Sequence, residues 1–341
     1  MRYINRTLFP VLIAAAALLL LTGAVQANTF NFQTLDNPGD PAFNQLLGIN
    51  NAGTIAGYFG DGTILPNKGY TLVPPSSYAN ENFPASVQTQ VIGINNVGTP
   101  ATNVGFYVDG SGNNFGFVDQ AGAFSSVSDP LTGTFGGITT NQLLGVNNND
   151  VAAGFYVDSS GVDNAYLYNI PLTTFTPVVL PGSFGAVNTT ATGVNNAGVV
   201  GGFFTDGSGA FHGFVDNGGT FTQLDDPDGT NTMVLGLNNN GEFVGSYVNG
   251  SGETQGFTYN INTHTWQTVS EPGASATAAF GVTGTTVNGV NDLGDLVGFY
   301  SDGANVNGFL ATPTPEPAGF FPILLGGALA MGFRRLLSRS A

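Results

Sequence analysis

The stretch Gly145-Val146-Asn147-Asn148, followed shortly by Gly154-Phe155-Tyr156, decides the fold because the chain repeats it six times. Each copy opens with a glycine, an apolar residue and two asparagines or their equivalent. The six openings are Gly48-Ile49-Asn50-Asn51, Gly93-Ile94-Asn95-Asn96, Gly145-Val146-Asn147-Asn148, Gly193-Val194-Asn195-Asn196, Gly236-Leu237-Asn238-Asn239 and Gly289-Val290-Asn291-Asp292. Self-similarity at a period of about 45 residues is the mark of a repeat architecture.

Each copy predicts four short strands. The opening is followed by a strand such as Gly105-Phe106-Tyr107, a turn such as Asp109-Gly110-Ser111-Gly112 and a second aromatic strand such as Gly116-Phe117. A fourth strand closes the unit, as in Thr220–Leu224 and Trp266–Val269. The turn residues accept positive φ, which tight hairpins need, and no stretch has helical periodicity with caps. Four strands in about 45 residues is typical of a propeller blade.

The two ends of the repeat array predict that the ring closes. The sixth copy ends at Gly308-Phe309-Leu310-Ala311 without a fourth strand, while Thr29–Leu35 is a strand without a unit. We therefore predict an all-β, six-bladed propeller of four-stranded blades whose N-terminal strand completes the last blade and removes the open edges. The glycine of each opening suits an inner strand with no room for a side chain. The rival is an open β-solenoid, which needs caps that the sequence does not show.

Composition limits the partners of the central segment, residues 28–312. This segment holds one basic residue, Lys68, and 21 of the 22 acidic residues, which gives a net charge of about −20. Because phosphate binding depends on Lys and Arg, such a surface excludes nucleic acid and anionic lipid as partners. It favours cations and neutral, hydroxyl-rich partners. The alternative is that the acidity serves only solubility.

The chain has no cysteine, so disulfides, thiolate catalysis and cysteine-ligated metal are excluded. Stability must come from a large core, for which 27 Phe and 11 Tyr supply material. Trp266 stands where other copies have Phe, which favours core packing over a sugar-stacking platform. The asparagines of the openings are expected to form turns and side-chain to backbone hydrogen bonds rather than a ligand site.

Strand order predicts an acidic face. In a meander, the turns between second and third strands and the loops between blades lie on one side. These segments hold Asp36, Asp40, Asp61, Asp109, Asp129, Asp158, Asp206, Asp225, Asp226, Asp228, Glu271 and Asp302. Carboxylate-rich loops suit Ca²⁺, the one cofactor considered. The cation-binding candidates are Asp109, Asp158, Asp206, Asp225, Asp226, Asp228 and Asp302. The alternative is that Asp-Gly is an ordinary β-turn sequence; no loop has EF-hand spacing.

No catalytic residue is assigned from the sequence. Neither His212 nor His264 has a metal-ligand partner at the required spacing, and no Gly-x-Ser-x-Gly elbow joins a strand to a helix. Paired carboxylates of glycosidases meet in space rather than in sequence. The cluster Asp225, Asp226 and Asp228 therefore keeps a carbohydrate-active enzyme, a glycosidase or lyase, as the alternative to a binding protein.

Both termini predict targeting. Residues 1–27 have a basic start at Arg2 and Arg6, an apolar core and a small-residue cleavage site at Val25-Gln26-Ala27, the pattern of a secretory signal peptide; an uncleaved anchor is the alternative. In residues 313–341, the motif Pro315-Glu316-Pro317 precedes the apolar run Ala318–Phe333 and the basic pair Arg334-Arg335. The positive-inside rule keeps this basic pair, the membrane stop, in the cytoplasm.

The three-part C-terminus resembles the PEP-CTERM sorting signal of Gram-negative bacteria. That resemblance implies processing by an exosortase, transient anchoring in the inner membrane, and delivery to the cell surface, outer membrane or extracellular matrix, in an exopolysaccharide setting. The repeats resemble the HAF type of exported proteins, with His212-Gly213-Phe214 nearest to the His-Ala-Phe-like strand. This resemblance implies a propeller-like, extracellular protein and identifies no catalytic residues. We expect a structural or adhesive protein that binds polysaccharide or divalent cations.

Overall fold

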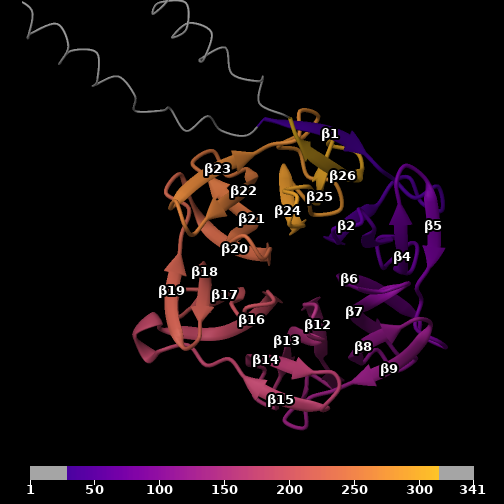
Figure 1. Ribbon diagram of the computed structural model, residues 1–341, viewed down its shortest axis with the longest axis vertical. Coiled ribbons are helices and arrows are strands. Elements are labelled where there is room, and N and C mark those ends of the chain that lie inside the picture. The colour runs from indigo at the N-terminus through magenta and orange to yellow at the C-terminus, as the bar shows by residue number, and fades with distance from the viewer. Residues whose placement is uncertain (1–28, 315–341) are drawn as a thin grey trace, which may run out of the picture.

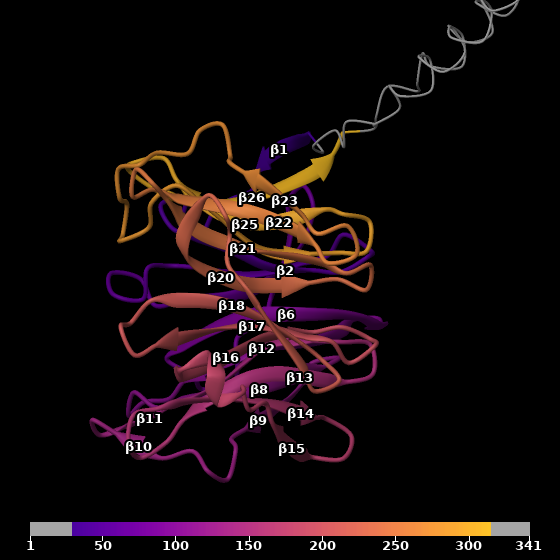
Figure 2. The same ribbon diagram turned by 90° about the vertical axis from the view of Figure 1, so that its left-hand side faces the viewer.

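The computed structural model describes residues 29–314, which form six four-stranded antiparallel sheets arranged in a ring (Figure 1). The strands run roughly along the axis of the ring, so turns collect at its two ends (Figure 2). The predicted six-bladed, all-β propeller is thus confirmed, and the open solenoid is excluded. Residues 1–28 and 315–341, which hold the predicted signal peptide and the sorting motif with Pro315, Glu316, Pro317, Arg334 and Arg335, lie outside the described residues. Within residues 29–314 no helix is long and apolar enough to span a membrane.

Each blade is a meander from the channel outward. The inner strands are β2 (Asn44–Ile49), β6 (Gln88–Gly98), β12 (Asn141–Val146), β16 (Ala186–Val194), β20 (Gly229–Leu237) and β24 (Thr285–Val290). The second strands are β3 (Ile55–Phe59), β7 (Ala101–Val108), β13 (Val151–Val157), β17 (Val200–Asp206), β21 (Glu242–Asn249) and β25 (Leu296–Ser301). The third strands are β4 (Lys68–Val73), β8 (Asn114–Gln120), β14 (Asp163–Asn169), β18 (Phe211–Asn217), β22 (Thr254–Asn260) and β26 (Val306–Pro313). The outer strands are β5 (Ser77–Asn80), β9 (Ala123–Val127), β15 (Thr174–Pro177), β19 (Thr220–Leu224), β23 (Thr265–Val269) and β1 (Phe30–Thr34).

The N-terminal strand closes the ring as predicted. β1 pairs antiparallel with β26, in register from Phe30 opposite Pro313 to Thr34 opposite Phe309. The backbone N–H of Thr314 also donates to the carbonyl of Thr29 at 2.8 Å. Figure 1 shows β1 lying beside β26, on the outside of the last blade. The outer edge of this blade is therefore covered by the start of the chain.

Close packing at the axis explains the repeated glycine. A Cβ added to Gly48 would lie 2.4 Å from the carbonyl oxygen of Ile92, and one added to Gly236 would lie 2.4 Å from that of Asn288. These oxygens belong to the neighbouring inner strands. A side chain at these positions would push two blades apart, which confirms the expectation for a crowded inner strand.

Aromatic rings on the third strands fill the spaces between sheets. Phe117, Phe214, Phe257 and Phe309 are fully buried, and burial of each such side chain stabilises the fold by about 1.5–3 kcal/mol. Trp266 is half-buried and packs against the core residue Tyr259 with ring centroids 4.4 Å apart, in agreement with the expected packing role. Each sheet thus depends on its neighbours for a buried face.

Two small elements had no sequence prediction. A hairpin of β10 (Thr134–Phe135) and β11 (Ile138–Thr139) extends the connection between the second and third blades. Its turn is Gly136-Gly137, with φ of 61° and 85°. A single 3₁₀ turn, Gly182–Phe184, lies between the third and fourth blades.

Candidate functional site: the central channel and its mouth

The first asparagine of each opening joins one blade to the next. The side-chain oxygen of Asn147 accepts the backbone N–H groups of Asn149 and Val151 at 2.9 and 3.0 Å. Its Nδ2 donates to the carbonyl of Asn195 in the next blade at 2.9 Å. The same inter-blade bond recurs from Asn50 to Asn95, Asn95 to Asn147, Asn195 to Asn238, Asn238 to Asn291 and Asn291 to Asn50. We call Asn50, Asn95, Asn147, Asn195, Asn238 and Asn291 the asparagine girdle; it confirms the predicted turn and hydrogen-bonding role.

The next residue of each opening forms a second ring beside the girdle. Each backbone N–H donates to the side-chain oxygen of the next blade's residue at 2.6–2.9 Å. The members are Asn51, Asn96, Asn148, Asn196, Asn239 and Asp292. Burial opposes ionisation of Asp292, but hydrogen bonds from Asn51 and Asn239 outweigh it and hold the Asp292 pKa below its usual value. The free space enclosed by this ring is only about 70 Å³, so this end of the channel is narrow.

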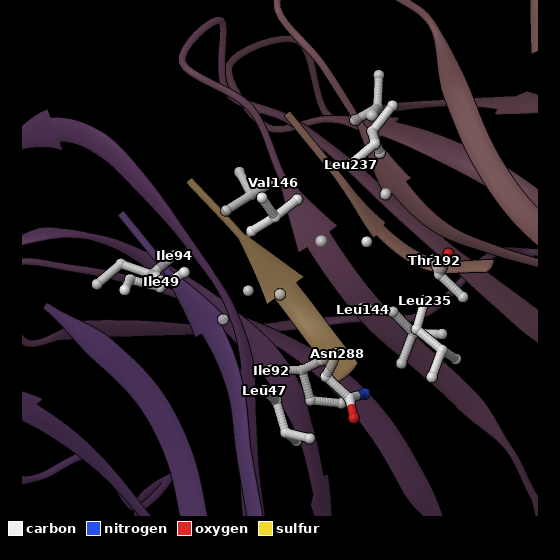
Figure 3. Close-up of a pocket in the computed structure, with 18 residues that line it drawn as sticks. Leu47, Ile49, Ile92, Ile94, Leu144, Val146, Thr192, Leu235, Leu237 and Asn288 are labelled. Carbon is white, nitrogen blue, oxygen red and sulfur yellow. The ribbon is translucent and has the colours of Figure 1, made fainter. Parts of the chain in front are cut away.

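The glycines of the six openings and the mostly apolar residues beside them line the middle of the channel. Figure 3 shows Leu47, Ile92 and Asn288 close together, with Val146 further along the channel. The remaining free space here is about 90 Å³. A ligand larger than a few waters therefore has no room in the middle of the ring.

The other end of the channel opens into a cavity of about 490 Å³, which we call the channel cavity. It lies where the inner strands begin and the second strands end, so its walls come from all six blades. Three glutamines and three phenylalanines stand out among its lining residues: Gln45, Gln90, Gln142, Phe106, Phe203 and Phe299. Leucine, methionine, threonine, serine and other uncharged residues complete the wall; no Asp, Glu, His or Lys belongs to it. Such a cavity can bind an uncharged ligand but offers no acid or base.

Neighbouring side chains orient two of the three glutamines. Gln45 accepts the hydroxyl of Tyr58 through Oε1 at 2.8 Å, and Gln90 donates through Nε2 to Asn67 at 2.9 Å. This leaves the Nε2 of Gln45 and the Oε1 of Gln90 for a ligand. An amide presents a donor and an acceptor, which suits the hydroxyl groups of a sugar.

The aspartates predicted to bind cations are committed to their own turns. Asp109, Asp158 and Asp206 each accept two backbone N–H groups through one carboxylate oxygen at 2.7–3.1 Å. Asp302 does the same with Ala304 and Asn305. A hydrogen bond from the Ser208 hydroxyl, with those from backbone groups, lowers the pKa of Asp206 to about 2. These contacts therefore support the alternative interpretation, in which the aspartates stabilise ordinary Asp-Gly or Asp-x-x-Gly turns.

The other three candidates sit in the loop after β19. Asp225 lies 2.9 Å from Nδ1 of His212, whose Nε2 is 3.6 Å from Asp206. Asp226 is buried, which raises its pKa, and its carboxylate accepts the N–H of Asp228. None of the seven candidates lines the channel cavity. In residues 29–314, no group of three or more His, Cys, Asp or Glu side chains is placed to hold a metal ion. Cation binding stays a prediction of the sequence.

Sequence reasoning did not find the channel cavity. The available signal was positional: Gln45, Gln90 and Gln142 occupy one place in three repeats, three residues before the glycine of the opening. Phe106, Phe203 and Phe299 likewise follow the glycine of the second strand in three repeats. Only the closed ring brings these six side chains together.

Comparison with known proteins supports the fold. No family model and no curated protein matches the chain, so the PEP-CTERM and HAF resemblances stay predictions. Among solved structures, the SapL1 lectin in complex with α-methyl fucoside is 12% identical over 81% of this chain and 97% of that one, with a TM-score of 0.50. A six-bladed fucose-recognising lectin of Aleuria aurantia is 12% identical over 82% and 98%, with a TM-score of 0.49. TolB from Acinetobacter baumannii is 12% identical over 82% and 62%, with a TM-score of 0.43.

Proposed function

We propose that this protein is an exported binding protein that holds a neutral saccharide in the channel cavity and does not transform it. One observation carries the proposal: the cavity combines oriented amides and aromatic rings with a lining that contains no ionisable side chain. Glycoside hydrolysis needs two carboxyl groups about the scissile bond. The enzyme alternative therefore has no support from this cavity.

The chemistry of the lining fits a sugar. Ligand sites are concave, mostly apolar and contain a few placed polar groups, and a volume of about 490 Å³ falls within their usual range. Phe106, Phe203 and Phe299 offer apolar surface to the C–H groups of a pyranose ring, while Gln45, Gln90 and Gln142 offer hydrogen bonds to its hydroxyls. The likeness to the SapL1 lectin, which is a likeness of fold, agrees with this proposal.

The cellular location is part of the proposal and rests on the sequence of the two termini. A signal peptide in residues 1–27 and a sorting signal in residues 313–341 support export, exosortase processing and a structural or adhesive role at the cell surface or in the matrix. Mass spectrometry of the secreted chain tests this location and processing. We expect a mature N-terminus at Asn28 and the loss of residues after Pro315-Glu316-Pro317; an intact chain in the inner membrane contradicts it.

Titration with neutral glycosides tests the binding function. Methyl glycosides of glucose, galactose and fucose are titrated into the full-length chain and into Gln142→Ala and Phe203→Ala variants. We expect at least one glycoside to bind, and each substitution to weaken its binding about tenfold, because each removes a central contact. Gln33→Ala, on exposed β1, is the control and keeps the affinity of the parent.

Two results contradict the proposal. One is the absence of binding to all three glycosides and to neutral oligosaccharides on a glycan array. The other is release of reducing sugar from exopolysaccharide that is lost when Asp225, Asp226 and Asp228 are replaced, which favours the enzyme instead.

A further inference from the structure

A second cavity, of about 720 Å³, lies on the first blade and holds the one lysine of residues 29–314. We call it the blade-one cavity. Its walls include Lys68 at the start of β4, Tyr70 on the same strand and Tyr78 on β5. Phe59, Phe83 and the amides of Asn37, Asn80 and Asn82 also line it. No acidic side chain belongs to this lining.

Lys68 has no carboxylate partner. Although residues 29–314 contain 21 acidic side chains, the ion pairs found among them are those of His212 with Asp206 and Asp225. Lys68 is half-buried as a residue, and its ammonium makes one long, exposed hydrogen bond, 3.4 Å, to the carbonyl of Val87. In the other blades this position is Phe115, Asn164, His212, Gln255 or Asn307. The sole ammonium group of an acidic ring thus faces a cavity with its charge uncompensated.

Tyr70 supplies a second, independent observation. Its side chain is 2% exposed, and its hydroxyl is buried without a hydrogen-bond partner. An unpaired buried hydroxyl carries a free-energy cost, so native proteins rarely keep one without a reason. Four of the other blades avoid the cost with phenylalanine: Phe117, Phe214, Phe257 and Phe309.

The third blade shows what the first blade lacks. Its equivalent residue, Tyr166, is equally buried, but its hydroxyl receives a hydrogen bond from Asn141 at 2.6 Å. The matching asparagine of the first blade, Asn44, turns its amide to the carbonyl of Asp40 and the N–H of Asn37 instead. Tyr70 is therefore left with an unfilled hydrogen-bonding position, buried in the wall of the blade-one cavity.

We propose that the blade-one cavity binds an acidic sugar, a uronate, with its carboxylate on Lys68 and a ring or hydroxyl oxygen on the Tyr70 hydroxyl. Tyr78 and Phe59 supply apolar surface for the sugar ring, and the asparagine amides meet its remaining hydroxyls. Such a ligand compensates the lysine and satisfies the buried hydroxyl together. The site is separate from the channel cavity and does not require that cavity to bind anything.

Two ligands that differ in one group test the proposal. Methyl β-D-glucuronide and methyl β-D-glucoside are titrated into the full-length chain by ligand-observed NMR at pH 7. We expect the glucuronide to bind about tenfold more tightly, because a charge-assisted hydrogen bond to Lys68 adds to its affinity. Lys68→Gln, the residue type of the fifth blade, is expected to abolish this preference and leave glucoside binding unchanged.

The tyrosines give a matched pair of variants. Tyr70→Phe, the residue type of four sister blades, is expected to weaken glucuronide binding about fivefold without lowering the melting temperature. Tyr166→Phe removes a hydroxyl that is already paired, so it is expected to lower the melting temperature and leave binding unchanged. Equal affinities for the two ligands, or a preference that survives Lys68→Gln, overturn the proposal. If Gln142→Ala abolishes glucuronide binding, the ligand sits in the channel cavity, and the blade-one proposal fails while the proposed function stands.

Discussion

At the scale of single residues, the asparagine girdle explains why the opening motif is repeated so closely. Each girdle side chain accepts two N–H groups within its own turn and donates to the next blade, which requires an acceptor and a donor on one short side chain. Aspartate lacks the donor, and serine cannot span both contacts. The same six residues thus set the turns and join the blades.

Replacing one girdle residue tests this double role. Asn147→Ala leaves two N–H groups without partners and removes the inter-blade hydrogen bond to the Asn195 carbonyl, so we expect the free energy of unfolding to fall by about 2–4 kcal/mol. Urea unfolding followed by tryptophan fluorescence measures the change. Asn149→Ala, whose side chain makes one exposed contact to Asn196, is the control and should cost less than about 1 kcal/mol. Equal effects at the two positions contradict the assignment.

The candidate site was harder to predict than the fold for a reason visible in single residues. Asp109 and Asp206 attract attention in the sequence because they are charged, yet each is occupied by its own turn. Gln142 and Phe203 are unremarkable in the sequence and become a site only when the ring places them together. Tyr70 and Lys68 likewise gain meaning from what surrounds them in space.

At the scale of elements, strand periodicity and turn chemistry were sufficient to predict the four strands of each blade from the sequence. Predicted strands such as Thr220–Leu224 agree with the structure, and Trp266–Val269 differs from β23 by one residue. The hairpin β10–β11 was missed because two-residue strands carry no alternation to detect. Its Gly136-Gly137 turn was the available signal.

Glu81, beside the first blade's outer strand β5, makes stability depend on pH. Burial, and then the nearby Asp119 carboxyl of the second blade, raises the pKa of Glu81 from 4.5 to about 8. The folded state therefore holds this proton more tightly than the unfolded chain does. Stability from this group is complete below about pH 4.5 and is lost as pH rises toward 8.

Denaturation at several pH values tests this link between two blades. The free energy of unfolding is measured from pH 6.5 to 8, above the range in which Asp36, with a pKa raised by burial to about 6, contributes most. We expect it to fall with rising pH in the parent and much less in Glu81→Gln. Glu253→Gln, in the turn after β21, is the control and keeps the parental slope. A Glu81→Gln variant with that same slope contradicts the assignment.

At the scale of the whole molecule, closure by β1 makes one cooperative ring from six units that each bury one face on the next. The chain has no native cysteine, so closure can be tested with a single engineered pair. Gln33→Cys with Leu310→Cys places thiols on directly paired residues of β1 and β26. We expect an intramolecular disulfide on oxidation, with a gain of about 2–4 kcal/mol in stability. Gln33→Cys with Thr222→Cys, in the fourth blade, should stay reduced.

The ring also separates the two cavities for which we propose ligands. The channel cavity is uncharged and central, whereas the blade-one cavity is peripheral and contains the one lysine of residues 29–314. No Asp or Glu side chain belongs to either lining. A matrix polymer with neutral and acidic sugars would engage both cavities, and binding at two sites would raise its overall affinity.

Diffraction from a crystal of the chain soaked with the glycoside that binds best in solution tests the central claim most directly. We predict sugar density at the mouth of the channel, in contact with Gln142 and Phe203 and intact at its glycosidic bond. Density for a neutral sugar only on the outer surface of the blades, or a cleaved glycoside in the channel, contradicts the account.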